Sequence, residues 1–418
     1  MYKINVKEYN KNEVVNMNFL VIAQDLRVSG TSEGIVSRSF IAKLRMAYPK
    51  AIIDVLYIKN HNSEDQLELL PVNSIQSHVI NLKPTFSVKW INRFTRRVFN
   101  ISWYDRFIHK SYAKHIATID HAKYNHVFIR SAGLNHEIIL AAKDLQILKK
   151  AIINFHDPYP FFWYQGSKQE LSGDELNRFH NMYKVVQQAK GCISTAKMMS
   201  QDLEFLYGSR KQFYTLPHQF SETVFNLTDI EHVRKKQKPV TLAYHGSIQF
   251  GRQIDVLLDA YDTLVKTNTQ IKEHTEFVLR LGGGDVQRLR SKYAKNKNIS
   301  ILGTLNFSNS SYEQMHSADI NIILENGPLY CNILVGKAPF LASLNKPIFC
   351  VSPRRSELRH LINDVKYIAS GDDIEEVKEK LEALISKNII SKEPVFPFGD
   401  YFSDTNFVNK LDNILKEN

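Results

Sequence analysis

Cysteine is scarce in this chain of 418 residues, and its arrangement argues against two classes of protein. Cys192, Cys331 and Cys350 stand far apart and form no Cys-x-x-Cys pair. A disulfide framework and a structural zinc site both need cysteines at short, regular spacings, so neither is expected. A reducing, cytoplasmic compartment fits this composition best.

Long apolar runs and several catalytic signatures are also missing. No run approaches the roughly 18 apolar residues that indicate a membrane span, and residues 1–18 are too polar for a signal peptide. The phosphate-binding motif GxxxxGK[ST] and the zinc motif HExxH do not occur. Asp372 and Asp373 stand at a charged helix start, where they complement the helix dipole rather than bind a metal. We expect no membrane span, no metal and no cofactor.

The formal net charge of +11 is concentrated in an aromatic segment that only Asp105 opposes. Its basic residues are Lys89, Arg93, Arg96, Arg97, Arg106, Lys110 and Lys114, and its aromatic residues are Trp90, Phe94, Phe99, Trp103, Tyr104 and Phe107. Cations and aromatic rings at helical spacing are typical of a helix that rests on anionic lipid headgroups. The alternative is an amphipathic helix with its rings in the core and its cations in solvent. Nucleic acid is not expected, because neither a zinc-finger spacing nor an RNP-type strand is present.

The second half of the chain predicts a parallel sheet. Residues 240–258, VTLAYHGSIQFGRQIDVLL, combine an apolar strand, a glycine turn ending in Arg252, and a helix. Short apolar runs recur at 277–285, 299–305, 320–324 and 347–351, with helix-length polar segments between them. This alternation is typical of βαβ units. Because open parallel sheets bind ligands beyond the carboxyl ends of their strands, we expect a nucleotide or phosphate site in the turns.

The first half repeats this organisation. Apolar runs predict strands over 18–24, 51–58, 126–129, 151–155, 191–194 and 214–217. A helix is predicted over 35–46 and a last helix over 405–415. We expect an α/β protein with two Rossmann-like domains that face each other across a cleft. The boundaries are a first domain over 1–222, a linker over 223–238, a second domain over 239–395, and a C-terminal helical segment over 396–418.

Several motifs of the second half together resemble the C-terminal domain of GT-B glycosyltransferases, in particular the retaining family 4. They are GSIQFGRQIDVL at 246–257, the LGGGD turn at 281–285, ILGTL at 301–305, SADINII at 317–323 and GKAPFLASLNKP at 336–347. The resemblance extends over essentially the whole chain, because the first half has the expected glycine loop and an INFHD strand end. It implies a C-terminal helix that returns towards the N-terminal domain. It also implies metal-independent transfer of a sugar from a nucleotide-diphosphate donor, with retention of configuration.

The chain departs from the family's pattern at named positions. The family's first turn usually carries an arginine and a lysine, whereas this chain has Ser247 and Arg252 there. The family also has two glutamates eight positions apart, the second of which holds the nucleotide ribose. Alignment on Lys337 and Pro347 places Asn332 and Phe340 at these two positions. Glu325 stands at the wrong offset for either role.

Transfer from a nucleotide-diphosphate sugar needs positive charge, because the diphosphate gains negative charge as the glycosidic bond breaks. Arg252 and Lys337 are the candidate cations. Arg252 follows a strand and a turn and precedes a helix, whereas Lys337 stands where VGKAPF opens a helix with proline in its first turn. An ordinary solvated charge is the alternative for both. The predicted donor-binding residues are Gly30, Thr31, Gly246, Ser247, Arg252, Gly303, Thr304, Leu305, Asn332, Ile333, Leu334, Val335, Gly336 and Lys337.

His156 is the third candidate catalytic residue. It follows the strand AIINF, so its side chain should face the cleft. An imidazole whose pKa lies near neutrality could bind the transferred sugar or orient the acceptor. A buried or capping histidine is the alternative.

The sequence leaves three functions open. The first is a glycosyltransferase that acts on a glycan or lipid-linked glycan acceptor in bacterial surface polysaccharide assembly, in the cytoplasm or at the inner face of the cell membrane. Its membrane or acceptor surface would be Trp90, Arg93, Arg96, Arg97, Trp103 and Arg106. The second is a catalytically decayed scaffold that partners an active transferase, which Asn332 and Phe340 favour. The third is a sugar-nucleotide epimerase, which would need carboxylates in the cleft.

Overall fold

A parallel sheet with the strand order β3-β2-β1-β4-β5-β6-β7 organises the first half of the chain. The computed structural model describes residues 17–63, 65–161, 163, 168, 170–208, 210–228, 230–327 and 329–418. Most of the segment judged too polar for a signal peptide, residues 1–16, lies outside this description. The strands are β1 Asn18–Ala23, β2 Ile52–Lys59, β3 Ser74–Val79, β4 His126–Arg130, β5 Ala151–Phe155, β6 Gly191–Ser194 and β7 Phe213–Thr215.

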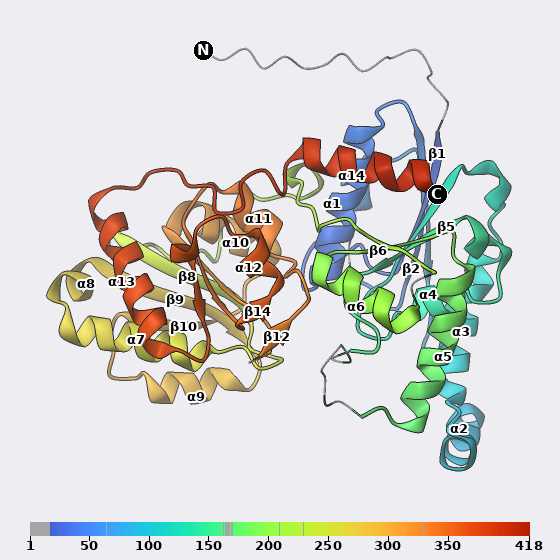
Figure 1. Cartoon of the computed structure of the whole chain (residues 1–418), viewed down its shortest axis with the longest axis horizontal. Helices are drawn as coiled ribbons and strands as arrows, with labels where there is room; N and C mark the ends of the chain where they lie inside the picture. Colours follow the sequence, from blue (N-terminus) through green and yellow to red (C-terminus); the bar gives the residue numbers. More distant parts are fainter. Residues whose placement is uncertain are drawn as a thin grey trace.

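A second parallel sheet, in the order β10-β9-β8-β11-β13-β15, organises the second half. Its strands are β8 Val240–Ser247, β9 Thr275–Gly282, β10 Ile299–Gly303, β11 Ile320–Leu324, β13 Ile348–Ser352 and β15 Ile368–Ser370. A small parallel pair, β12 Tyr330–Cys331 with β14 Arg355–Ser356, stands apart from it. Figure 1 shows the two sheets as separate layers side by side, each with its own helices. The predicted α/β architecture of two Rossmann-like halves is confirmed.

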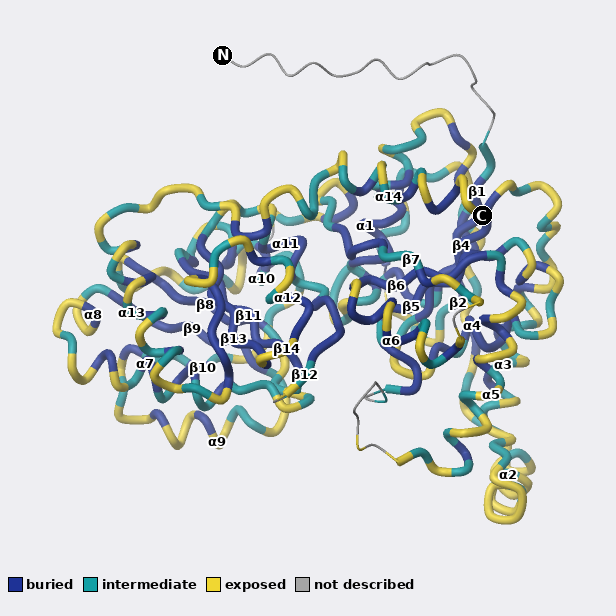
Figure 2. The backbone as a smooth tube through the Cα atoms, viewed as in Figure 1, coloured by how far each residue is buried: buried dark blue, intermediate teal, exposed yellow. Residues whose placement is uncertain are grey.

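Helices cover both sheets, so the central strands are buried along their length and are read in the sequence as continuous apolar runs. The helices of the first half are α1 Ser32–Ala47, α2 Phe86–Phe99, α3 Trp103–Ile116, α4 Glu137–Ala141, α5 Gly173–Gln188 and α6 Lys197–Tyr207. Those of the second half are α7 Ile254–Thr267, α8 Thr269–His274, α9 Asp285–Lys292, α10 Phe307–Tyr312, α11 Ala338–Ser343, α12 Glu357–Leu361, α13 Ile374–Ile390 and α14 Asp404–Glu417. Figure 2 shows the buried backbone concentrated in the two sheets.

Helix α14 leaves the second sheet and packs on the first half, as predicted (Figure 1). Its buried residues Phe407, Leu411, Ile414 and Leu415 belong to the same apolar cluster as strand β1. The rings of Phe407 and Phe40 meet edge to face at 6.3 Å. The last helix therefore completes the core of the N-terminal domain.

Strands β3 and β15 were not predicted. Strand β3 lies at the edge of its sheet and carries mostly exposed polar residues, SIQSHV, so it lacks the apolar run of a buried strand. Strand β15 is also an edge strand and has only three residues. The basic aromatic segment also differs from the single helix expected, because Asn100 adopts φ 53° and ends α2 before α3 begins.

Candidate functional site

A cleft with a cavity volume of about 570 Å³ lies between the two halves of the chain. One wall comes from the loop after β1 and the start of α1. The other comes from the turns that follow β8, β10 and β11 and from the loop that leads into α11. Both sheets thus direct the carboxyl ends of their strands towards the cleft, where parallel sheets bind ligands.

Arg252 and Lys337 meet on the C-terminal wall around the ring of Tyr244. Arg252 Nε donates to Asn326 Oδ1 at 2.9 Å, and one of its terminal nitrogens donates to the Ser247 carbonyl at 2.7 Å. Lys337 Nζ donates to the His245 carbonyl and lies 4.4 Å from the centroid of the Tyr244 ring. Both cations line the cleft. The structure therefore brings together the two charges that the sequence singled out.

The Lys337 ammonium has no carboxylate partner among the residues that the structure describes. Burial, together with the nearby charge of Arg252, lowers its pKa from 10.5 to about 7. Gly246 leaves the space for this side chain, because a Cβ added there would lie only 2.9 Å from Lys337 Nζ. Its φ of 150° is also one that residues with a side chain rarely adopt. An anion entering the cleft would offset the cost of burying the ammonium charge.

The opposite wall presents the N-terminus of the 16-residue helix α1 to the cleft. Thr31 is its N-cap, and the Thr31 hydroxyl is buried without a hydrogen-bond partner among the described residues. Gly30, with φ 88°, turns the chain into this helix. Residues 30–34 also match the hydrolase pattern Gly-x-Ser-x-Gly, but Ser32 Oγ donates to Glu33 at 3.0 Å and is not paired with a histidine. Free backbone N–H groups at such a helix start favour an anion.

Two stacked histidines lie between these walls. The rings of His156 and His218 are 5.4 Å apart with an interplanar angle of 23°, and both residues line the cleft. Neither ring nitrogen of His156 has a hydrogen-bond partner among the described residues. Burial and the nearby Arg130 lower the pKa of His218 to about 3 and hold the pKa of His156 well below 6.5. The structure places His156 in the cleft, but the expected pKa near neutrality is wrong, because desolvation favours the neutral ring.

Two carboxyl groups also line the cleft, Glu33 on α1 and Asp157 after β5. Burial raises the pKa of Asp157 from 3.8 to about 7, and the negative charge of Glu33 adds to this rise. The cleft thus holds a group that can exchange a proton near neutral pH. Neither carboxyl group was predicted as a site residue from the sequence.

Most of the predicted donor-binding residues line the cleft. They are Gly30, Thr31, Gly246, Ser247, Arg252, Thr304, Leu305, Ile333, Leu334, Val335, Gly336 and Lys337. Gly303 and Asn332 do not. The Asn332 side chain donates to Asp202 Oδ2 at 2.7 Å and so ties its loop to the other domain. Phe340 lines the cleft within an aromatic cluster, 5.0 Å from the ring of Phe220, and Glu325 lies outside it.

A buried ion pair of the C-terminal wall was missed, and its cation, Arg280, lines the cleft. Arg280 in β9 makes two hydrogen bonds to Glu313, at 2.9 and 2.5 Å. His245 Nε2 lies 3.3 Å from Glu313 Oε1, and His245 Nδ1 is 2.8 Å from the Ser310 hydroxyl. Arg280 and His245 stand inside apolar strands. Their positions near the ends of β8 and β9 place their side chains near the carboxyl edge of the sheet. This position was the signal from which the sequence could have predicted them.

The two halves are also joined directly beside the cleft. Both oxygens of Glu357 accept hydrogen bonds from the first turn of α6, from Lys197 N at 2.8 Å and Met198 N at 2.9 Å. Ser29 Oγ accepts from Phe307 N at 2.9 Å. A carboxylate of one domain therefore caps a helix of the other, a favourable contact for the helix dipole.

The basic aromatic segment lies outside the cleft, on α2 and α3. No helix in the described ranges is both long and apolar enough to cross a membrane. Within the same ranges, no three His, Cys, Asp or Glu side chains gather as metal ligands.

Comparison with solved structures identifies this arrangement of two domains. HepE of Anabaena, in complex with UDP and glucose, is 11% identical, with a TM-score of 0.60 over 96% of this chain and all of that one. The lipopolysaccharide outer core galactosyltransferase WaaB is 13% identical, with a TM-score of 0.56 over 95% of this chain and 99% of that one. The chain has the GT-B fold.

The GT-B fold is shared with a further class of enzyme. A UDP-N-acetylglucosamine 2-epimerase is 12% identical, with a TM-score of 0.54 over 95% of this chain and 96% of that one. No family model matches the chain, and no curated protein matches it. The GT-B architecture is thus shown by structure, while membership of the retaining family 4 stays a prediction.

Proposed function

We propose that the protein is a glycosyltransferase that moves a sugar from a nucleotide-diphosphate donor to an acceptor hydroxyl. One observation carries the proposal: Arg252 and Lys337 lie together on one wall of the cleft. Two cations in a partly closed site would stabilise the diphosphate as its charge grows in the transition state. They are the charges that a metal ion would otherwise supply, so the proposed reaction uses none.

The donor would lie with its diphosphate between Arg252, Lys337 and the start of α1. Thr31 Oγ1, which is buried without a partner in the described chain, would then donate to a phosphate oxygen. Thr304 and Leu305, after β10, would lie beside the base. Phe340 replaces the family's ribose-binding glutamate, so contact of the ribose with this ring would take the place of a carboxylate hydrogen bond.

His156 and Asp157 would serve the sugar and the acceptor. A neutral imidazole with two unpartnered nitrogens can hydrogen-bond sugar hydroxyls without changing its charge. Asp157, whose pKa is about 7, can take the proton of the attacking hydroxyl. In the retaining reaction that the resemblance implies, this hydroxyl attacks from the face that the diphosphate leaves. A glycan or lipid-linked glycan of bacterial surface polysaccharide assembly is the proposed acceptor.

A sugar-nucleotide epimerase is the second candidate. Such an enzyme must remove a proton from carbon and return one, which is work for carboxyl groups. The cleft contains two of them, Glu33 and Asp157, and a solved epimerase shares the fold. The same cations would hold the same type of donor in either case.

One experiment separates these functions. The purified chain is mixed with UDP-, GDP-, ADP-, CMP- and dTDP-sugars, and its melting temperature is measured, since a ligand of the folded state raises it. The sugar that stabilises the protein is then followed by NMR without acceptor. Slow release of free sugar with its original anomeric configuration would support the transferase, and conversion into an epimer of the intact nucleotide sugar would support the epimerase. Stabilisation by none of the donors would contradict both and favour a decayed scaffold.

A further inference from the structure

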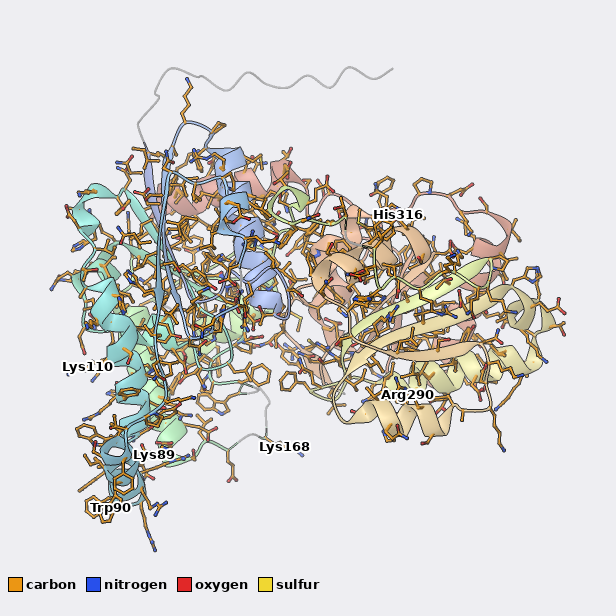
Figure 3. All side chains as sticks on the ribbon, turned by 180° about the vertical axis from the view of Figure 1, so that it is seen from behind. Lys89, Trp90, Lys110, Lys168, Arg290 and His316 are labelled. Carbon is orange, nitrogen blue, oxygen red and sulfur yellow. The ribbon has the colours of Figure 1, made fainter. Side chains whose placement is uncertain are left out.

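Helix α2 carries an apolar stripe that no other part of the described chain covers. None of its residues is buried, and Phe86 is 80% exposed, Trp90 65%, Phe94 58% and Val98 53%. These four residues are spaced by four, so they share one face of the helix. Helices of soluble proteins turn such a stripe towards the core, and an exposed one marks an interaction surface. Figure 3 shows Trp90 and Lys89 on this helix, at the outer end of the first domain.

Positive charge runs along the same helix. Lys89, Arg93 and Arg97 form no ion pair with a described residue, whereas Arg96 Nε lies 2.9 Å from Asp174 Oδ2. Helix α2 contains no acidic residue. These four cations also line an open groove between α2 and α3 with a volume of about 560 Å³, together with Tyr104. Apolar and cationic side chains therefore lie side by side on one projecting helix.

Hydrogen bonds join α2 to α3 and α3 to α5. Asn92 Oδ1 accepts a hydrogen bond from Tyr104 N at 3.0 Å, which joins α2 to the start of α3. Arg178 of α5 donates to both oxygens of Asp105, at 2.5 and 3.2 Å. Asn92 lies on the opposite side of α2 from Trp90 and Phe94, so this contact leaves the exposed apolar stripe facing outward.

We propose that α2 docks the protein onto an anionic phospholipid bilayer. Trp90 and Phe94 would enter the interface between headgroups and acyl chains, and Lys89, Arg93 and Arg97 would contact lipid phosphates. Charge complementarity selects this occupant. A second copy of the helix would bring the same cations face to face. A nucleic-acid backbone would neutralise the cations but leave Ile91 and Val98 in water. The proposal does not depend on glycosyl transfer.

Sedimentation of the full chain with lipid vesicles tests this directly. The wild-type protein should pellet with vesicles of phosphatidylcholine mixed with phosphatidylglycerol, and stay in the supernatant with phosphatidylcholine alone. The variant Lys89→Gln/Arg93→Gln/Arg97→Gln and the variant Trp90→Ser/Phe94→Ser should each lower the bound fraction at least tenfold. Both should retain the wild-type melting temperature, because none of the changed side chains is buried.

A matched control removes the same number of cations from a different part of the protein. Lys272→Gln/Lys295→Gln/Lys297→Gln removes three exposed cations from the other domain, and it should bind vesicles like the wild type. The proposal would be overturned if the wild-type protein did not bind anionic vesicles, or if the α2 variants pelleted with them like the wild type. A dimer that becomes monomeric in the Trp90→Ser/Phe94→Ser variant, without vesicle binding, would assign the stripe to a second copy and overturn it too.

Discussion

The ammonium of Lys337 lies over the ring of Tyr244, 4.4 Å from its centroid, with no carboxylate beside it among the described residues. The ring face and the His245 carbonyl stabilise the positive charge only in part. Burial and Arg252 lower its pKa to about 7, so the group is poised between two charge states in the free protein.

Donor affinity should therefore fall as the pH rises above about 7. A bound diphosphate favours the charged ammonium and raises its pKa, so binding above pH 7 takes up a proton and weakens by up to about tenfold per pH unit. Titration calorimetry across pH measures this, and buffers of different ionisation enthalpy reveal the proton. Lys337→Met should abolish the trend, and an equally steep fall in that variant would assign the proton elsewhere.

The stability of the ligand-free protein should change with pH in the opposite direction. Because the pKa of Lys337 is lowered from 10.5 to about 7 in the folded protein, the unfolded chain binds more protons between about pH 7 and pH 10.5. The contribution of Lys337 to the free energy of unfolding therefore rises with pH in this range.

Replacement of Arg252 by alanine should weaken donor binding more than tenfold, at least about 1.4 kcal/mol. Its guanidinium faces the cleft while two of its nitrogens hold Ser247 and Asn326, so part of the loss would come from a looser turn. Arg290→Ala is the matched control, because Arg290 also donates to a backbone carbonyl, that of Ile301 at 3.0 Å, but does not line the cleft. Affinity of Arg252→Ala equal to that of the control, measured by calorimetry with the donor found in the panel, would remove Arg252 from the site.

Glu33→Gln should shift the pH dependence of turnover. The negative charge of Glu33 helps to raise the pKa of Asp157 to about 7, so its removal should lower that pKa and move the acid limb of the rate profile to lower pH. Asp157→Asn should remove the limb.

The raised pKa of Asp157 also stabilises the fold at low pH, and this contribution is lost as the pH rises from 3.8 through about 7. Asp157→Asn should thus melt higher than the wild type above pH 7, whereas Asp144→Asn, at a side chain 86% exposed, should not. A wild-type pH profile in both cleft variants would contradict a role for Asp157.

Phe407→Ala should destabilise the N-terminal domain by about 3–5 kcal/mol. Phe407 of α14 is 1% exposed and packs against Phe40, so truncation would leave a cavity in that core. Phe396→Ala removes the same atoms from a side chain that is 61% exposed, and it should change stability by less than about 0.5 kcal/mol. Chemical denaturation of the two variants makes the comparison. Equal midpoints would mean that α14 contributes little to the fold.

The sequence predicted the central strands and two of the cations that line the cleft, Arg252 and Lys337, because buried strands, glycine turns and helix starts are visible in a single chain. Arg252 follows strand β8 after a short turn, and Lys337 immediately precedes helix α11. Glu33 and Arg280 were not singled out because their roles depend on partners in the same domain that lie far away in the sequence, Asp157 for Glu33 and Glu313 for Arg280, and no local pattern encodes such a pair. Edge strand β3 was missed for a local reason, since its exposed polar residues carry no apolar signal.

The pKa of His156 could not be predicted from its residue type and its place after a strand. A histidine after a strand suggests a titrating group near neutrality. In the folded chain, His218 and Arg130 surround it, and together with burial they keep it neutral. Arg130 ends β4 and His218 follows β7, so both neighbours come from other strands than the one before His156, and the charge state follows from the tertiary fold.

The position of helix α14 has a consequence for synthesis on the ribosome. The N-terminal sheet emerges first, but the apolar surface around Phe19 and Phe40 stays open until Phe407, Leu411 and Ile414 have been translated. The first domain made is thus the last to be finished, and its exposed patch must stay free of other chains throughout translation of the second domain. Nascent chains arrested before α14 should bind holdase chaperones, and chains that include it should be released.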